Sequence, residues 1–204
     1  MTLSLYLVRH GQTEWSLSGQ HTGRSDIPLT AQGEYEARAP APWLAGITFD
    51  RVFTSPRQRA QRTCVLTGFG VKAEIEPDLV DWDYGDYEGM RSAAIHSQRP
   101  QWTIFQDGCS GDEMPADIAT RPDRLIARLK QMQGQDRTVL SWAFRDRAGG
   151  AMDRAAGDRG AASLAFHGLR QCPRLHFFPS GRPGNRSVER NARTAGLAAS
   201  LSNG

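Results

Sequence analysis

Several features are scarce in this chain of 204 residues, and each scarcity excludes a class of protein. Lysine is almost absent: of 25 basic residues, only Lys72 and Lys130 are lysines, and the remainder are arginines. No Lys/Arg block occurs that could follow the phosphates of a nucleic acid, and the net charge is only +3. We therefore expect no nucleic-acid partner. The predominance of arginine indicates a GC-rich coding sequence.

Cysteine and long apolar runs are also scarce. Cys64, Cys109 and Cys172 lack the spacing of a disulfide framework or a metal site, so we interpret them as structural thiols in a reducing compartment. No run of 18 apolar residues could span a membrane, and the first residues lack the basic region and cleavage site of a signal peptide. The sequence predicts a cytoplasmic protein with no membrane partner, and it gives no indication of the oligomeric state.

The remaining composition is that of a globular domain. With 39% hydrophobic and 23% charged residues, the chain is neither disordered nor built from repeats. Apolar runs alternate with amphipathic segments, which predicts an α/β fold, a three-layer α/β/α sandwich with a mostly parallel central sheet. Strands are expected at residues 3–8, 49–54, 71–75 and 138–140, and helices after the N-cap Thr30, from Ser55 to Thr63 and at residues 121–132.

The last third of the chain has a different character. Residues 145–193 contain ten arginines, many Gly, Ala and Ser residues, and neither Ile nor Lys. Neither a helical nor a strand period is sustained across them. We therefore divide the chain into an α/β domain at residues 1–140 and a poorly specified tail at residues 141–204, and we expect the C-terminal part to be irregular.

Two clusters of candidate functional residues follow predicted strands. Arg9 and His10 come directly after the first strand, at the kind of strand end where open α/β sheets bind ligands. An imidazole can attack phosphorus, and a guanidinium can hold phosphate oxygens with paired hydrogen bonds. Arg59 lies near the start of the helix after the second strand, where it could meet the same phosphate as Arg9. A simple turn and a solvated helix face are the alternative interpretations of these two segments.

A third cluster, residues 78–89, holds five carboxylates and three aromatic residues. Carboxyl groups in such a loop are candidates for general acid catalysis. Metal binding is the competing interpretation, but the loop lacks histidine and the ordered spacing of a calcium site. We therefore predict no metal.

Together these segments resemble the histidine phosphatase superfamily, also called the phosphoglycerate mutase-like family. The similarity extends from residue 3 to about residue 140, and it is strongest to the sugar-phosphatase-like members that resemble sedoheptulose bisphosphatase. The segments that carry it are Arg9–Ser16, Ser18–Gly23, Thr54–Arg57, Trp82–Gly89 and Asp107–Cys109.

The resemblance implies specific roles. His10 would be the nucleophile that becomes phosphorylated, and Arg9 and Arg59 would bind the phosphoryl oxygens. The family's general acid, usually Glu, falls at Asp81, whose side chain is one methylene shorter. The resemblance implies no metal and no organic cofactor. The residues expected on the substrate side are Thr13, Ser16, Thr22, Gly23 and Tyr84.

One element of the family pattern is missing. The resemblance implies a second histidine, in a His-Gly motif after the strand that begins at Thr138, but Ser141, Trp142 and Ala143 stand there. His167-Gly168 lies about 25 residues later and has no strand before it, so we do not expect it to substitute.

A reading-frame shift upstream of Ser141 is our hypothesis for this gap. Permitted codons for residues 138–144, read one base later, give Leu-Phe-Ser-His-Gly-His-Phe. Most of these letters depend on codon choice, but Trp142 before Ala forces Gly, and Met152 before Asp forces Trp. A tail out of frame would leave one side of the phosphate pocket open. The hypothesis therefore predicts a protein of low stability with slow phosphoryl transfer. Sequencing the gene across codons 130–180 tests the hypothesis.

The sequence thus predicts a phosphomonoester hydrolase acting on a small phosphorylated metabolite, a sugar phosphate, through a phosphohistidine. The first alternative is a phosphoglycerate mutase-type transferase. The second is an inactive relative that binds phosphorylated ligands without transfer. We do not expect a Rossmann-type dinucleotide protein, because no Gly-x-Gly-x-x-Gly follows the first strand.

Overall fold

A computed structural model describes residues 4–111, 113–131, 137–142, 174–178 and 188–191 of the chain. The described strands form one six-stranded sheet in the order β3-β2-β4-β1-β5-β6. All neighbouring strands are parallel except β5 and β6, which are antiparallel. The strands are β1 (Ser4–Arg9), β2 (Arg51–Thr54), β3 (Ala73–Ile75), β4 (Arg137–Trp142), β5 (Arg174–Phe178) and β6 (Val188–Asn191).

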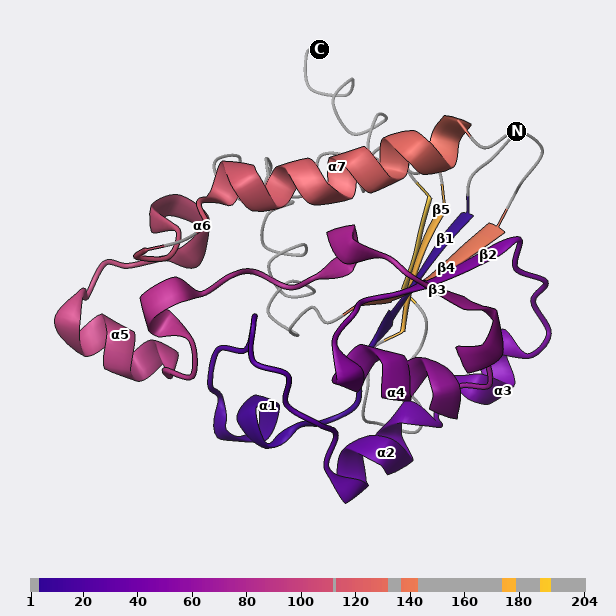
Figure 1. Cartoon of the computed structure of the whole chain (residues 1–204), viewed down its shortest axis with the longest axis horizontal. Coiled ribbons are helices and arrows are strands. Elements are labelled where there is room, and N and C mark those ends of the chain that lie inside the picture. Colours follow the sequence, from indigo (N-terminus) through magenta and orange to yellow (C-terminus); the bar gives the residue numbers. More distant parts are fainter. Residues whose placement is uncertain (1–3, 112, 132–136, 143–173, 179–187, 192–204) are drawn as a thin grey trace, which may run out of the picture.

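Helices lie on both sides of this sheet. In Figure 1, α7 runs along one face while α2, α3 and α4 cover the other, which gives three layers. The predicted α/β class with a mostly parallel central sheet is therefore confirmed. The α-helices are α1 (Glu14–Ser18), α2 (Ala31–Ala37), α3 (Ala41–Leu44), α4 (Gln58–Leu66), α5 (Ser92–Gln98), α6 (Ile104–Asp107) and α7 (Pro115–Gln131), and the 3₁₀ helices are η1 (Gly70–Lys72), η2 (Pro77–Leu79) and η3 (Gly85–Tyr87).

Two hydrophobic clusters hold these layers together. One packs β1 and β2 against α3 and α4 through Val8, Val52, Leu44 and Cys64. The other includes three aromatic residues of the 82–87 segment and packs this segment against α5. Its buried members are Trp82, Tyr84, Tyr87, Ile95, Trp102 and Cys109. The burial of Cys64 and Cys109 agrees with structural thiols, and Cys172 lies outside the described residues.

Several predicted boundaries differ from the structure. The helix expected from Ser55 begins at Gln58, because Arg57 has an extended backbone (φ −76°, ψ 135°) and serves as the N-cap. The helix expected at residues 121–132 begins earlier, at Pro115, a residue suited to a first helical turn. Val71 lies in η1 rather than in the third strand.

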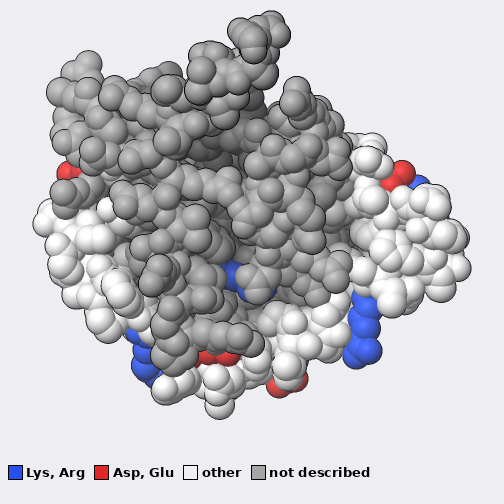
Figure 2. All heavy atoms as spheres, turned by 180° about the vertical axis from the view of Figure 1, so that it is seen from behind, with Lys and Arg blue, Asp and Glu red and all other residues white. Residues whose placement is uncertain are grey.

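The tail contains two strands that its sequence pattern did not indicate. β5 pairs with β1, from Ser4 with Arg174 to Val8 with Phe178, and β6 pairs with β5. Within the described residues, no helix combines the length and the apolar character needed to cross a membrane. Figure 2 shows one face of the molecule, where the described acidic and basic side chains are scattered rather than gathered into one patch.

Candidate active site

A small pocket opens where β1 ends. Because β1, β2 and β4 are parallel, their carboxyl ends meet at the same edge of the sheet, and the loops that follow them come together there. The pocket is lined by Arg9, His10, Thr13, Ser16, Gln20, Thr22, Asp81 and Tyr84. Seven of the nine predicted site residues are among these eight, and Gly23 and Arg59 are not.

His10 is buried, and its ring is oriented by the neighbouring backbone. Its Nδ1 lies 2.7 Å from the carbonyl oxygen of Gly11. A carbonyl oxygen can only accept, so Nδ1 carries the proton of the neutral ring and Nε2 carries the lone pair. In this tautomer Nε2 is the basic nitrogen of the ring.

Gly11 allows the loop after β1 to pack closely. A Cβ atom at this position would lie 2.0 Å from the carbonyl oxygen of Gly33 in α2, so no larger residue fits without displacing the backbone. The Gly11 amide donates to Thr63 Oγ1 at 3.1 Å, and that hydroxyl donates to the carbonyl of Arg59. The loop that carries His10 is thereby tied to both α2 and α4.

Arg59 is fully buried on α4 and holds the 22–25 loop. Its Nη1 donates to the carbonyl of Ser25 at 2.9 Å, and its Nη2 donates to Thr22 and Gly23 at 3.3 and 3.4 Å. Burial lowers the pKa of Arg59, but arginine remains charged at neutral pH. Its guanidinium therefore contacts the main chain beside the pocket, and its predicted role in binding phosphate remains a proposal.

Glu88 holds the same loop from the opposite side. Its carboxylate accepts from the amides of Gly23 at 3.0 Å and Ser25 at 2.9 Å. Gly23 is required here because a Cβ would lie 2.0 Å from the carbonyl oxygen of Trp82. Glu88 was expected only as one carboxylate of the acidic segment and as part of the Trp82–Gly89 motif, because no local signal connects it to a loop 65 residues away.

Asp81 differs from the other carboxylates of that segment. Asp78 is paired with Arg124 and Asp83 with Arg24, whereas Asp81 is buried in the pocket wall and its Oδ1 accepts from the Trp82 amide at 2.8 Å. Burial raises the pKa of Asp81 to about 6, although the charges of Arg59, Arg121 and Arg9 oppose this shift. A carboxyl group with this pKa can hold a proton near neutral pH and release it to a leaving group.

Polar uncharged side chains complete the pocket. Thr13 caps α1, and its hydroxyl accepts from the Ser16 amide at 3.1 Å while Ser16 Oγ accepts from the Thr13 amide. The ring of Tyr84 stacks on His21, with ring centres 4.6 Å apart. Gln20 was not among the predicted site residues. Its Nε2 donates to the carbonyl of Gly89 at 2.8 Å, a contact between distant segments.

Ser141 and Trp142, which stand where the resemblance implies a second histidine, lie at the carboxyl end of β4. β4 lies between β1 and β2, with Ser141 opposite Val8 and Trp142 opposite Arg9. The main chain of Ser141 and Trp142 therefore runs beside the residues that enter the pocket from β1. His167 lies outside the described residues. In the described ranges, no group of three or more His, Cys, Asp or Glu side chains could hold a metal ion.

Comparison with known families agrees with this geometry. The model of the histidine phosphatase superfamily, branch 1, matches residues 5–142, more than half of the chain. This chain belongs to the histidine phosphatase superfamily. The matched region includes His10, Arg59 and Asp81 and ends at the carboxyl end of β4.

Sequence matches to individual relatives cover different lengths of this chain. Sedoheptulose 1,7-bisphosphatase of Saccharomyces cerevisiae is 36% identical over 156 residues, and the match covers 65% of this chain and 57% of the yeast protein. An acid phosphatase of Mycobacterium tuberculosis is 35% identical over 147 residues, covering 71% of this chain and 72% of its own. A 2,3-bisphosphoglycerate-dependent phosphoglycerate mutase of Mesorhizobium japonicum is 43% identical, but the match covers only 44% of this chain.

A solved structure shares the fold. The product of the open reading frame Rv3214 of M. tuberculosis superposes with a TM-score of 0.68 at 27% identity, covering 93% of this chain and 96% of the other. The family, the fold and the phosphatase and mutase names of the relatives all agree with the resemblance seen in the sequence.

Proposed function

We propose that this histidine phosphatase hydrolyses phosphomonoesters of a small phosphorylated metabolite, with a sugar phosphate as the substrate class. The observation that carries the proposal is that His10, Arg9 and Asp81 line one pocket. They supply a nucleophile, a phosphate-binding cation and a carboxyl group with a raised pKa. With Arg59 beside the pocket and water as the second reactant, these side chains account for both steps of a hydrolysis.

In the first step, the lone pair of His10 Nε2 attacks phosphorus and the ester P–O bond breaks. The departing oxygen takes the proton of Asp81, which leaves an alcohol and an Asp81 carboxylate. Arg9 and Arg59 stabilise the charge on the phosphoryl oxygens as it builds up. The product of this step is a phosphohistidine at His10.

In the second step, water attacks the phosphorus of the phosphohistidine. The Asp81 carboxylate accepts a proton from this water, the N–P bond breaks, and its electron pair returns to Nε2. Inorganic phosphate leaves, and Asp81 is again protonated for the next substrate. One carboxyl group thus serves as the general acid in the first step and as the general base in the second.

The uncharged part of the lining supports the proposed substrate class. Hydroxyl and amide groups from Thr13, Ser16, Gln20, Thr22 and Tyr84 can hydrogen-bond to the hydroxyls of a sugar. The name of the yeast relative, sedoheptulose 1,7-bisphosphatase, supports the same class. The cytoplasmic location expected from the sequence stays a prediction.

Two alternatives each have one supporting observation. A mutase, which returns the phosphoryl group to a bound carboxylic acid such as phosphoglycerate, is supported by the mutase relatives. Interconversion of phosphorylated isomers instead of phosphate release would identify it. An inactive relative that only binds phosphorylated ligands is supported by Ser141 and Trp142, which stand where the resemblance implies a second histidine. Ligand binding without phosphate transfer to His10 would identify it.

A panel of phosphate esters tests the proposal. The parent chain is compared with His10→Ala and with the chain restored to the alternative reading frame after residue 140. We expect slow phosphate release by the parent, a loss of at least about a thousandfold in His10→Ala, and faster release by the restored chain. His96→Gln, on α5, is the matched histidine control. Equal activity in parent, His10→Ala and restored chain would overturn the proposed mechanism.

A further inference from the structure

The segment that carries Asp81 belongs to neither a helix nor a strand. Residues 80–84 run irregularly between η2 and η3, so no ladder of backbone hydrogen bonds fixes their position. The Asp81 side chain is also short, with only two rotatable bonds, and cannot compensate for a backbone shift as well as a glutamate could. The place of its carboxyl group is therefore set mainly by whatever holds the main chain.

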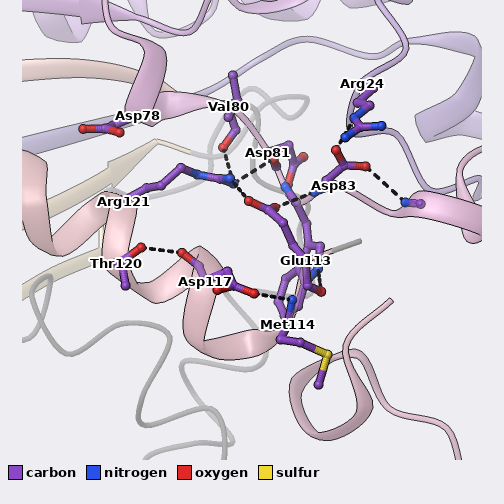
Figure 3. A network of polar contacts seen from close by, with 12 residues as sticks. Arg24, Asp78, Val80, Asp81, Asp83, Glu113, Met114, Asp117, Thr120 and Arg121 are labelled. Carbon is purple, nitrogen blue, oxygen red and sulfur yellow. Dashed lines mark hydrogen bonds and ion pairs between the residues drawn. The ribbon is translucent and has the colours of Figure 1, made fainter. Parts of the chain in front are cut away.

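Arg121 and Glu113 hold this main chain. Arg121, on α7, donates from Nη2 to the carbonyls of Val80 at 3.3 Å and Asp81 at 3.0 Å, and its Nη1 pairs with Glu113 Oε1. The other carboxylate oxygen of Glu113 accepts from the Asp83 amide at 2.8 Å. Figure 3 shows these contacts converging on the 80–83 segment.

The contacts are continuous along the segment. The main-chain carbonyl of Glu113 accepts from Trp82 Nε1 at 3.1 Å, so each residue from 80 to 83 is bonded to Glu113 or to Arg121. The two clamping side chains are only 16% and 15% exposed, which limits competition from water. This arrangement holds the main-chain carbonyls of Val80 and Asp81 and the amide of Asp83, on both sides of the Asp81 side chain.

We propose that Glu113 and Arg121 are positioning residues for Asp81, keeping its carboxyl group within reach of the leaving-group oxygen. This inference rests on the proposed function, in which Asp81 is the general acid. Neither residue is among those that line the pocket, so they act through the backbone of Asp81 and not on the substrate. A loss of this support displaces a proton donor without removing it.

Arg124 provides a matched control on the same helix. It lies three residues after Arg121 and also binds a carboxylate, through Nη2 and Nε at 2.6 and 3.1 Å from Asp78. Its hydrogen bonds go to the Asp78 side chain and not to the main chain of residues 80–83. Substituting Arg124 therefore removes an ion pair of α7 while leaving the support of Asp81 intact.

The leaving group of the substrate separates positioning from general damage. An alkyl phosphate such as glycerol phosphate needs an acid to protonate its departing oxygen, whereas p-nitrophenolate departs without one. For Glu113→Gln and Arg121→Lys we expect kcat for the alkyl ester to fall about tenfold or more, with KM and the rate on p-nitrophenyl phosphate within about twofold. Arg124→Gln should leave both rates within about twofold.

Two results would overturn the positioning role. Either both esters slow equally in Glu113→Gln and Arg121→Lys, as in a general distortion, or neither ester slows. Amide hydrogen exchange on the same variants provides a readout that needs no activity. We expect the Trp82 and Asp83 amides to exchange faster in Glu113→Gln and to be unchanged in Arg124→Gln, and unchanged exchange in both would reject the clamp.

These readouts separate the two proposals. If the parent hydrolyses neither ester, the proposed function fails while the exchange rates still test the clamp. Suppose instead that the parent is active, and that Glu113→Gln and Arg121→Lys keep the parental ratio of rates on the alkyl ester and p-nitrophenyl phosphate. The positioning role then fails while the hydrolase function stands.

Discussion

The two sides of the pocket differ in how completely the chain builds them. On one side, His10, the 22–25 loop and the Asp81 segment are each held by contacts from elements far apart in sequence. On the other side, β4 brings Ser141 and Trp142 next to the end of β1, where the resemblance implies a His-Gly pair. The difference teaches that most of the predicted site residues are brought into one pocket although the histidine that the resemblance implies at the end of β4 is absent from the sequence.

Replacing the residues of the β4 side should have the largest effect. Ser141→His combined with Trp142→Gly supplies the implied pair at the carboxyl end of β4. Because one preorganised donor to a developing oxyanion is worth about a hundredfold to a thousandfold, we expect kcat to rise by a factor of that order. Phosphate release from a sugar phosphate measures it.

The control for this gain is the same double substitution combined with His10→Ala, which should stay inactive. A double variant no faster than the parent would contradict the account of the β4 side. It would show that the missing histidine is not what limits the rate.

Removing the acid should have the next largest effect. Asp81→Asn should lower kcat for an alkyl phosphate about a hundredfold, because a positioned acid contributes about that factor. The raised pKa means that the group is mostly protonated below pH 6 and mostly ionised above it. The first step should therefore slow as the pH rises through about 6, and this limb of the pH profile should disappear in Asp81→Asn.

The wrong sign of the pH dependence would be decisive. If the parental rate of phosphoenzyme formation increases as Asp81 ionises, the carboxyl group is not the acid of that step. p-Nitrophenyl phosphate serves as the control substrate, since its rate should depend little on Asp81.

The smallest expected effect concerns the loop beside Arg59. Glu88→Gln weakens charge-assisted hydrogen bonds to Gly23 and Ser25, and we expect it to lower the free energy of unfolding by about 1–2 kcal/mol. Glu74→Gln is the control: its pair with Arg51 is about half exposed and should contribute less than about 0.5 kcal/mol. Chemical denaturation compares the two, and equal losses would mean that Glu88 does not support the loop.

The sequence predicted the sheet better than the contacts that complete the site. β1 and β2 hold short apolar runs that are buried, and β4 contains the apolar pair Val139-Leu140, so the sequence pattern predicted all three strands. β5 and β6 have no such pattern, since residues 145–193 lack a strand period. The predicted first residues of helices were wrong by several positions. A helix start depends on backbone angles that no periodicity encodes, such as the extended backbone of Arg57.

The same contrast holds within the site. Arg9 and His10 were predicted from a strand end, and the family resemblance singled out Asp81 within a carboxylate-rich loop. All three line the pocket. Gln20, Glu88, Glu113 and Arg121 were missed because their partners are distant in sequence. Gln20 contacts Gly89, and Arg121 contacts Asp81 from 40 residues away. Only the folded chain brings these groups together.

The most direct test of the central claim is to trap the phosphoryl group on the protein. The parent chain is mixed with a phosphate ester, quenched under conditions that preserve phosphohistidine, and digested for mass spectrometry. We predict a phosphoryl group on His10 in the parent and in His96→Gln, and none in His10→Ala. Phosphate release by the parent with the phosphoryl group on another residue, or with equal release by His10→Ala, would contradict the account.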